Sequence, residues 1–119
     1  MKRKHNYKEL MVWQKSRAFV SKIYITTKNF PKEELFCLTQ QMRRAAISIP
    51  SNIAEGFGRG TNPQIVHFLD IAQGSAFELE TQIYIALDLR YITSEYCDNL
   101  QMEMEEIKKM IDALQSAYS

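Results

Sequence analysis

The stretch QMRRAAISIPSNIAEGFGRG, which runs from Gln41 to Gly60, decides the fold of this chain. Apolar residues recur in it at spacings of three and four, which is the period of one helix face. With one leucine from the preceding residues, this apolar line consists of Leu38, Met42, Ala45, Ile49, Ile53 and Gly56/Phe57. We therefore expect a long amphipathic helix that buries one face and ends in the glycines.

The glycine-rich exit GFGRG has two interpretations. Glycines let backbone amides approach a phosphate group, but a dinucleotide-binding or P-loop fingerprint needs a preceding strand and a lysine or third glycine at the right spacing. A helical pattern precedes the glycines here. We therefore interpret the segment as a helix C-terminal cap in which Gly58 or Gly60 takes the left-handed conformation.

Pro50 lies in the middle of the predicted helix. It has no N–H to bond the carbonyl of Ala46, and its ring presses on the preceding turn, so a kink is expected. A helix that stops at Ile49 and restarts at Pro50 is the alternative, but it would expose Ile53 without a turn residue to explain the break. We expect one continuous helix from about Thr39 to Phe57, kinked near Pro50.

A polar line follows the same helix beside the apolar one, at spacings of three and four. We expect its side chains to form a structural polar network with two glutamates of the facing helix. The members of this predicted network are Gln41, Arg43, Arg44, Ser48, Asn52, Glu55, Arg59, Glu78 and Glu80. Charge-assisted bonds would hold Arg43 or Arg44 against a glutamate, within the bundle or across subunits. The alternative is a solvated face, because most charged side chains are exposed.

Three further blocks carry the helical period, and no period-two run of strand length appears between them. The first ends at Phe30-Pro31, the second begins at Asn62-Pro63, and the third follows Thr93 or Ser94. Their predicted core lines are Leu10, Trp13, Val20, Ile23, Thr27 and Phe30; Ile65, Phe68/Leu69, Ala72, Ser75/Ala76, Leu79, Ile83, Ala86 and Leu89; and Cys97, Leu100, Met104, Ile107, Ile111, Leu114 and Tyr118. We expect an all-α, antiparallel up-down-up-down four-helix bundle. Residues 1–119 would form this single domain, with residues 1–7 as a flexible basic arm.

Charge is segregated along the 119 residues, although the formal net charge is only +1. Residues 1–60 hold twelve Lys and Arg against four Glu, which is +8, and residues 61–119 hold three against ten Asp and Glu, which is −7. A protomer with one basic and one acidic side favours head-to-tail contact between subunits. The alternative is that the two halves neutralise each other inside one bundle and that hydrophobic contacts drive assembly.

The basic half is also where a nucleic acid would bind, because Lys and Arg pair with phosphates. The candidate contacts are Lys2, Arg3, Lys4, Lys8, Lys15, Arg17 and Lys22. We expect a homo-oligomer that contacts RNA or DNA through these side chains. The alternative is an assembly protein whose partners are all proteins.

No residue pattern indicates catalysis, a metal or a cofactor. The two cysteines, Cys37 and Cys97, and the two histidines, His5 and His67, argue against a structural metal site. No stretch approaches the roughly 18 apolar residues that a membrane span requires. We expect a cytoplasmic, non-enzymatic protein with no cofactor and no membrane contact.

Four motifs together resemble one known family. They read EL-x-VWQKSR, FP-x-E-E, L-x-x-Q-x-RRA-x-x-SIP-x-NIAEG-x-GR and FL-x-IA-x-GSA-x-ELE-x-Q, and they span about residues 9 to 92. This pattern is similar to that of the four-helix-bundle proteins first noticed as reading frames in intervening sequences of bacterial 23S ribosomal RNA genes. The most specific part is SIPSNIAEGFGR.

The resemblance implies a compact bundle that assembles into a homo-pentamer and whose biochemical role is unassigned. The sequence is also similar to the accessory protein of diversity-generating retroelements, a basic pentameric barrel that binds nucleic acid and a reverse transcriptase. That similarity implies a nucleic-acid or protein partner by analogy. On this interpretation the stretch from Gln41 to Gly60 is a structural element of the bundle, and function lies on the assembled surface.

Overall fold

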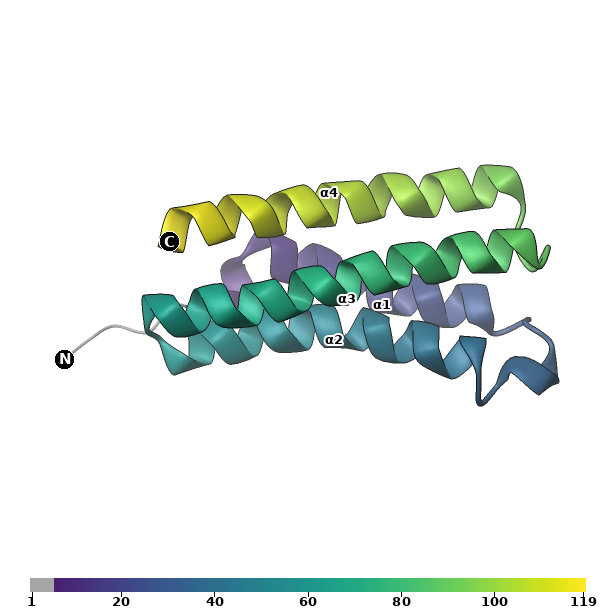
Figure 1. The fold of residues 1–119 in the computed structure, drawn as a ribbon, viewed down its shortest axis with the longest axis horizontal. Coiled ribbons are helices and arrows are strands. Elements are labelled where there is room, and N and C mark those ends of the chain that lie inside the picture. The colour runs from purple at the N-terminus through teal and green to yellow at the C-terminus, as the bar shows by residue number, and fades with distance from the viewer. Residues whose placement is uncertain (1–5) are drawn as a thin grey trace.

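The computed structural model describes residues 6–119 as four α-helices and two short 3₁₀ turns. Helix α1 spans Met11–Thr27, α2 spans Leu38–Arg59, α3 spans Asn62–Asp88 and α4 spans Ser94–Tyr118. Turn η1 (Tyr7–Glu9) precedes α1, and turn η2 (Lys32–Glu34) lies between α1 and α2. Figure 1 shows successive helices running in opposite directions along the molecule. The all-α prediction is confirmed.

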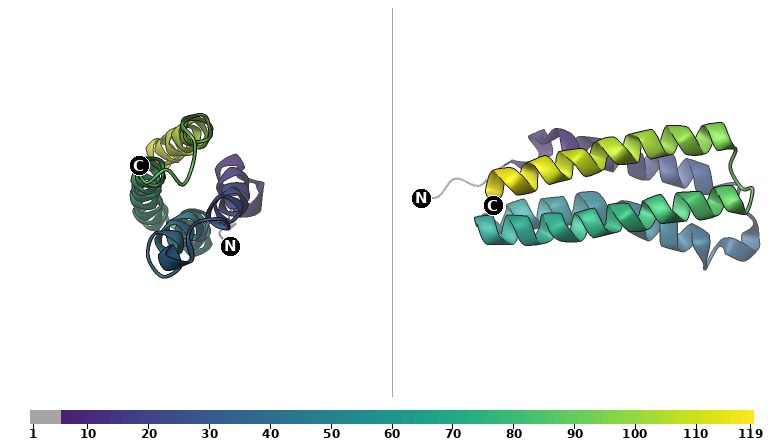
Figure 2. Two further views of the ribbon diagram at one scale, coloured as in Figure 1. Left: turned by 90° about the vertical axis from the view of Figure 1, so that its right-hand side faces the viewer. Right: turned by 45° about the horizontal axis from the view of Figure 1, so that its top comes forward.

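The four helices are arranged around the bundle in chain order, as the view along its axis shows (Figure 2, left). Helices α2 and α3 make the most extensive contact, followed by α3 with α4 and α1 with α2. Helices α1 and α4 meet least. The molecule therefore has one tight seam, between α2 and α3, and one loose seam, between α1 and α4.

The core lines predicted for α2, α3 and α4 are confirmed along most of their length. Side chains with almost no exposed surface run along the inside of these helices: Met42, Ile49, Ile53, Phe57, Ile65, Leu69, Leu79, Ile83, Met104, Ile107 and Ile111. Leu89 was predicted to be buried but is exposed. The reason is that α3 ends at Asp88, so Leu89 belongs to the turn.

The core line predicted for the first helix is wrong by about one position at its start. The buried residues of α1 are Val12, Ser16, Phe19, Ile23 and Thr27. Trp13 and Val20 are only partly buried and pack against the edge of the core. The polar Ser16 makes this line hard to recognise in the sequence. Ser16 can be buried because its hydroxyl donates a hydrogen bond to the carbonyl of Trp13 at 3.2 Å.

Helix α2 is continuous through the buried Pro50, as predicted, and extends from Leu38 to Arg59. Its C-terminal cap is Gly60, with a φ of 81°, and the Gly60 N–H donates to the carbonyl of Gly56. Of the two cap candidates the structure therefore selects Gly60, because the left-handed region favours a residue without Cβ. The kink at Pro50 stays a prediction.

Part of the predicted flexible arm is packed against the bundle. Tyr7 begins η1, and its ring meets the Trp13 ring edge-on with centroids 5.3 Å apart. The Asn6 side chain caps this turn by accepting a hydrogen bond from the Lys8 N–H at 3.2 Å. Tyr7, the last residue of the predicted arm, therefore packs against the bundle, and residues 1–5 lie outside the described part of the chain.

The tight α2–α3 seam depends on Gly56. A Cβ at this position would lie 2.9 Å from Cβ of Phe68 and 3.3 Å from Cα of Ile65, both on α3. These atoms are fixed to the α3 backbone and cannot swing away. A Cβ at Gly74, an exposed glycine in the middle of α3, would meet nothing within 4 Å.

We predict opposite effects for the two glycine substitutions. Gly56→Ala should reduce the free energy of unfolding by about 1 to 3 kcal/mol, because the added methyl group overpacks the seam. Gly74→Ala should raise it by roughly 0.5 to 1 kcal/mol, because alanine favours the helix and has room. Denaturant titration of both variants measures these changes, and equal effects would show that α2 and α3 can separate at no cost.

Candidate interaction surfaces

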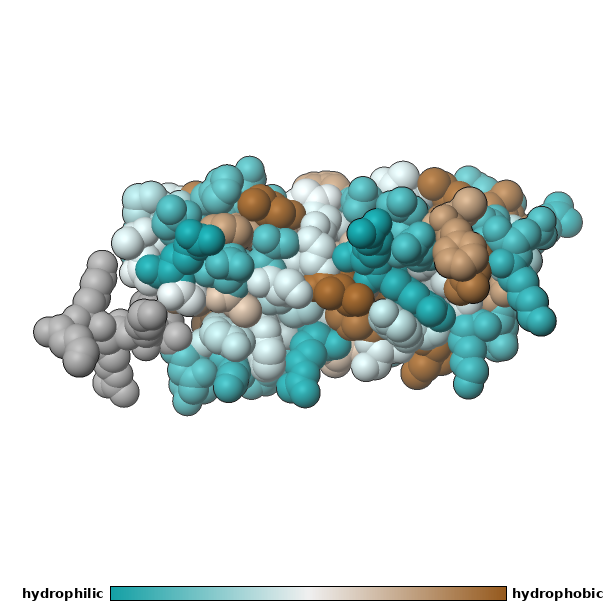
Figure 3. Space-filling model, turned by 90° about the horizontal axis from the view of Figure 1, so that it is seen from below, coloured by the Kyte–Doolittle hydropathy of each residue, from teal (hydrophilic) through white to brown (hydrophobic). Residues whose placement is uncertain are grey.

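A groove between α1, the η2 segment and α2 holds much of the exposed apolar surface. It has a volume of about 360 Å³ and is lined by Tyr24, Leu35, Phe36, Thr39, Gln40, Arg43, Arg44 and Ile47. We call this set the basic groove. Phe36 is 80% exposed, and Tyr24, Leu35 and Ile47 are exposed as well. Figure 3 views the molecule from the side of α2, and hydrophobic residues gather in its right-hand half, towards the end that carries η2.

The segment that forms one wall of the basic groove is held by contacts with the turn between α3 and α4. The Tyr91 hydroxyl, in the turn between α3 and α4, donates to Oε2 of Glu34 in η2 at 2.7 Å. This hydrogen bond is the main reason that the pKa of Tyr91 rises to about 12. The Phe30 ring packs on the Tyr91 ring with centroids 5.0 Å apart. The segment that carries Phe36 is therefore anchored at its base while the Phe36 ring projects outward.

Arg43 is fixed within the basic groove, although not by a carboxylate. Its Nε donates to Oγ1 of the buried Thr27 at 2.9 Å, and its guanidinium lies 4.4 Å from the centre of the Tyr24 ring. Within residues 6–119 no ion pair joins Arg43 or Arg44 to Glu55, Glu78 or Glu80, the glutamates predicted to hold one of these arginines. Glu55 and Glu80 bind other cations, and a contact across subunits stays a prediction.

The predicted polar network divides into separate parts. Ser48 and Ser75 join α2 to α3 through their hydroxyls at 2.7 Å, and Asn52 Nδ2 donates to the Ser48 hydroxyl at 2.8 Å. Arg59 donates to Glu55 one turn earlier, at the surface, and the Arg59 guanidinium lies over the Phe68 ring. The remaining members, Gln41, Arg44 and Glu78, are exposed. The part centred on Ser48 joins α2 to α3, while Arg43 joins α2 to α1 and Glu80 joins α3 to α4.

Three of the seven candidate nucleic-acid contacts, Lys15, Arg17 and Lys22, are engaged inside the chain. Lys15 pairs with Glu106 at 2.9 Å and Lys22 pairs with Glu103, and both pairs cross the loose seam from α1 to α4. The Arg17 guanidinium stacks over the Trp13 ring at 5.3 Å. Lys8 is exposed. Lys2, Arg3 and Lys4 lie outside the described residues.

A second exposed apolar surface lies along α3 and α4. Phe77 and Tyr84, both about half exposed, follow the same face of α3 as Glu80, which contacts α4. On α4, Asp98, Met102 and Glu105 share one face by their spacing of four and three. We call these six residues the acidic face: Phe77, Glu80, Tyr84, Asp98, Met102 and Glu105.

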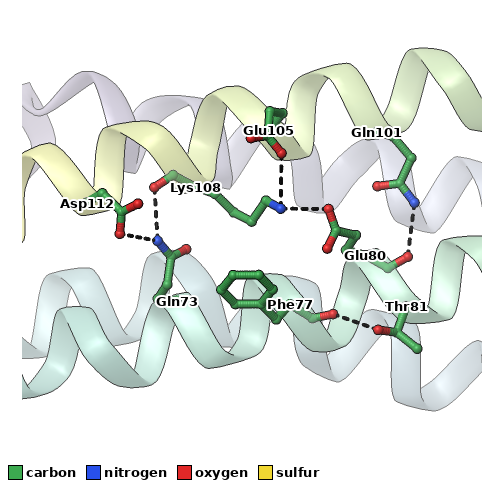
Figure 4. Close-up of polar contacts among 8 residues, drawn as sticks. All are labelled: Gln73, Phe77, Glu80, Thr81, Gln101, Glu105, Lys108 and Asp112. Atoms are coloured by element: carbon green, nitrogen blue, oxygen red, sulfur yellow. Dashed lines mark hydrogen bonds and ion pairs between the residues drawn. The ribbon is translucent and has the colours of Figure 1, made fainter.

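Lys108 binds the two helices together beneath the acidic face (Figure 4). Its Nζ lies 2.6 Å from Oε2 of Glu80 and 3.0 Å from Oε2 of Glu105, and 4.7 Å from the centre of the Phe77 ring. Burial lowers the pKa of Lys108, but the hydrogen bonds and charges of the two glutamates outweigh this effect and raise the pKa overall. Lys108 is therefore charged at neutral pH.

Gln73 makes a second connection one turn away. Its Nε2 donates to the carbonyl of Lys108 at 3.0 Å and to Oδ1 of Asp112 at 2.7 Å (Figure 4). Neither Gln73 nor Lys108 was predicted from the sequence, because each lies next to a core line rather than on it. A lysine at a position facing α3, among the many acidic residues of α4, is the signal that could have revealed Lys108.

The described part of the chain offers no assembled chemical centre. Within residues 6–119, no three His, Cys, Asp or Glu side chains are grouped so that they could hold a metal ion. The described helices include none that is long and apolar enough to cross a membrane. What the surface presents is two apolar areas with opposite charges at their rims.

Comparison with known proteins identifies the family of this chain. The family model described as "23S rRNA-intervening sequence protein" matches residues 8–113. The chain belongs to this 23S rRNA-intervening sequence protein family. None of the curated proteins searched matches the sequence.

A solved structure extends the comparison to the fold. It is a protein of unknown function from the S23 ribosomal protein family of Bacteroides thetaiotaomicron, and it has a TM-score of 0.80 and 24% sequence identity. The match covers 88% of this chain and 95% of that chain. The similarity confirms the bundle. The similarity to the accessory protein of diversity-generating retroelements stays a prediction.

For this member of the 23S rRNA-intervening sequence family we predict that Lys108→Met lowers the free energy of unfolding by about 1 to 3 kcal/mol. The substitution keeps the length of the side chain but leaves Glu80 and Glu105 facing each other without a cation. Lys109→Met, at the exposed neighbouring position, is the matched control and should change stability by less than about 0.5 kcal/mol. Denaturant titration near neutral pH compares them, and equal losses would mean that the Lys108 contacts contribute nothing specific.

Proposed function

We propose that this protein is a non-enzymatic, homo-oligomeric scaffold or adaptor of the cytoplasm, assembled as a ring of five subunits. The observation that carries the proposal is the clustering of exposed aromatic and aliphatic side chains in the basic groove and on the acidic face. Contiguous exposed apolar surface is typical of protein interaction sites. The number five comes from the family resemblance rather than from these surfaces.

Hydrophobic contact is the expected main source of assembly energy. The Lys15–Glu106 and Lys22–Glu103 pairs already join basic α1 to acidic α4 inside one chain. This internal pairing leaves less of the opposite charge of the two halves available between subunits. Charged rims then steer the encounter and select its orientation, while apolar side chains supply most of the affinity.

The full chain should therefore sediment with five times the mass of one protomer. That mass should persist from low salt to about 1 M salt, where the Debye length falls to about 3 Å and exposed charges are screened. Sedimentation equilibrium across a salt series measures both quantities. A monomer at low salt would contradict the proposed assembly, and a ring that dissociates in salt would identify charge as its main support.

Contact with RNA or DNA is a second candidate function, favoured by the excess of cations in residues 1–60, which is twelve against four. Lys8 and Arg44 are exposed and make no ion pair within residues 6–119. Phosphate contacts release counterions, so the logarithm of the affinity should fall steeply with the logarithm of the salt concentration. Titration of mixed RNA and DNA at low salt tests this function, and undetectable binding leaves proteins as the only partners.

A further inference from the structure

Given the proposed assembly, on which this inference rests, we propose how the subunits join. The basic groove of one copy binds the acidic face of the next copy, so that each protomer contributes two different surfaces. The occupant of the groove is thus a second copy of this chain. Three properties of the described surface support the pairing: its apolar content, its charge and its position.

Both surfaces present large apolar side chains that their own bundle leaves exposed. The Phe36 ring is the most exposed large hydrophobic residue of the basic groove, and Met102, at 72% exposed, is the most exposed of the acidic face. Aromatic side chains buried at the centre of an interface are commonly its main energetic anchors. Phe36 is such an anchor on one side, and Phe77 and Tyr84 are its counterparts on the other.

The rims of the two surfaces carry opposite charges. Arg43 and Arg44 line the groove, and Arg44 makes no ion pair within residues 6–119. On the acidic face, Glu80, Glu105 and Asp98 outnumber Lys108, the cation that the two glutamates share. A groove placed against another groove, or a face against another face, would bring like charges together. Groove against face is the arrangement that opposes plus to minus.

The two surfaces lie on different sides of the protomer. In the view along the bundle axis, α1 and α2 occupy one side and α3 and α4 the other (Figure 2, left). A contact between two different surfaces is heterologous, and it repeats from copy to copy until the rotation closes a ring. The same contact cannot produce a two-fold symmetric dimer that stops at two copies.

Two substitutions that introduce a charge at exposed apolar positions test the pairing. Phe36→Glu blocks the basic groove by facing acid with acid, and Tyr84→Lys blocks the acidic face by facing base with base. Each variant alone should sediment as a protomer. Mixed together, they should form a complex that neither forms alone, because each variant retains the one surface that the other lacks.

Ile25→Asp is the matched control, because Ile25 is 67% exposed but lies outside both surfaces. It should assemble as the unmodified chain does, and circular dichroism should show equal helicity in all three variants. If the unmodified chain is itself a monomer, the proposed assembly fails. If it assembles, the pairing alone is overturned by an oligomer in either blocked variant, or by a mixture that stays monomeric.

Discussion

The close approach of α2 and α3 is the constraint on which the rest of the structure depends. Gly56 permits it, because a Cβ there would collide with the backbone side of α3 at Phe68. The Ser48–Ser75 hydrogen bond then fixes the register of the two antiparallel helices. With this pair set, α1 and α4 can pack only on its two flanks, α1 through α2 and α4 through α3. The loose seam between α1 and α4 is a consequence, and two surface ion pairs, each of the kind that contributes little stability, bridge it.

Most of the fold was predictable because it follows from periodicity. Three of the four core lines, the continuity of α2 and the glycine cap could be predicted without knowing which helices lie beside one another. Where periodicity failed, a polar side chain had found a local partner: Ser16 lies in the core of α1 because it bonds to the carbonyl of Trp13. Whether a buried polar group finds a hydrogen-bond partner depends on the path of the folded backbone, and a count of apolar residues cannot reveal that path.

The candidate surfaces were less predictable, for a physical reason. Arg43 was expected to bind a glutamate, since charge is the strongest visible signal in a sequence, but the helix orientation directs it towards Thr27 and Tyr24. Cross-helix partners such as Lys108 and Glu80 are set by the register of α3 against α4, which one sequence does not state. The exposure of Phe36 depends likewise on the hydrogen bond between Tyr91 and Glu34, groups 57 positions apart that meet only after folding.

Because the helices pack around the bundle in chain order, the basic and acidic halves of the sequence form different sides of the molecule. Since neighbouring helices in the chain are neighbours around the bundle, residues 6–60 build the α1–α2 side and residues 61–119 build the α3–α4 side. An order that placed α1 between α3 and α4 would interleave basic and acidic helices and cancel the difference. The described parts of the two halves touch at the two seams between them and where Tyr91 meets Phe30 and Glu34. At the loose seam lysines of α1 meet glutamates of α4, and at the tight seam the contacts are small and uncharged, as between Ser48 and Ser75. The charge that is left faces outward on opposite sides, where only another molecule can neutralise it.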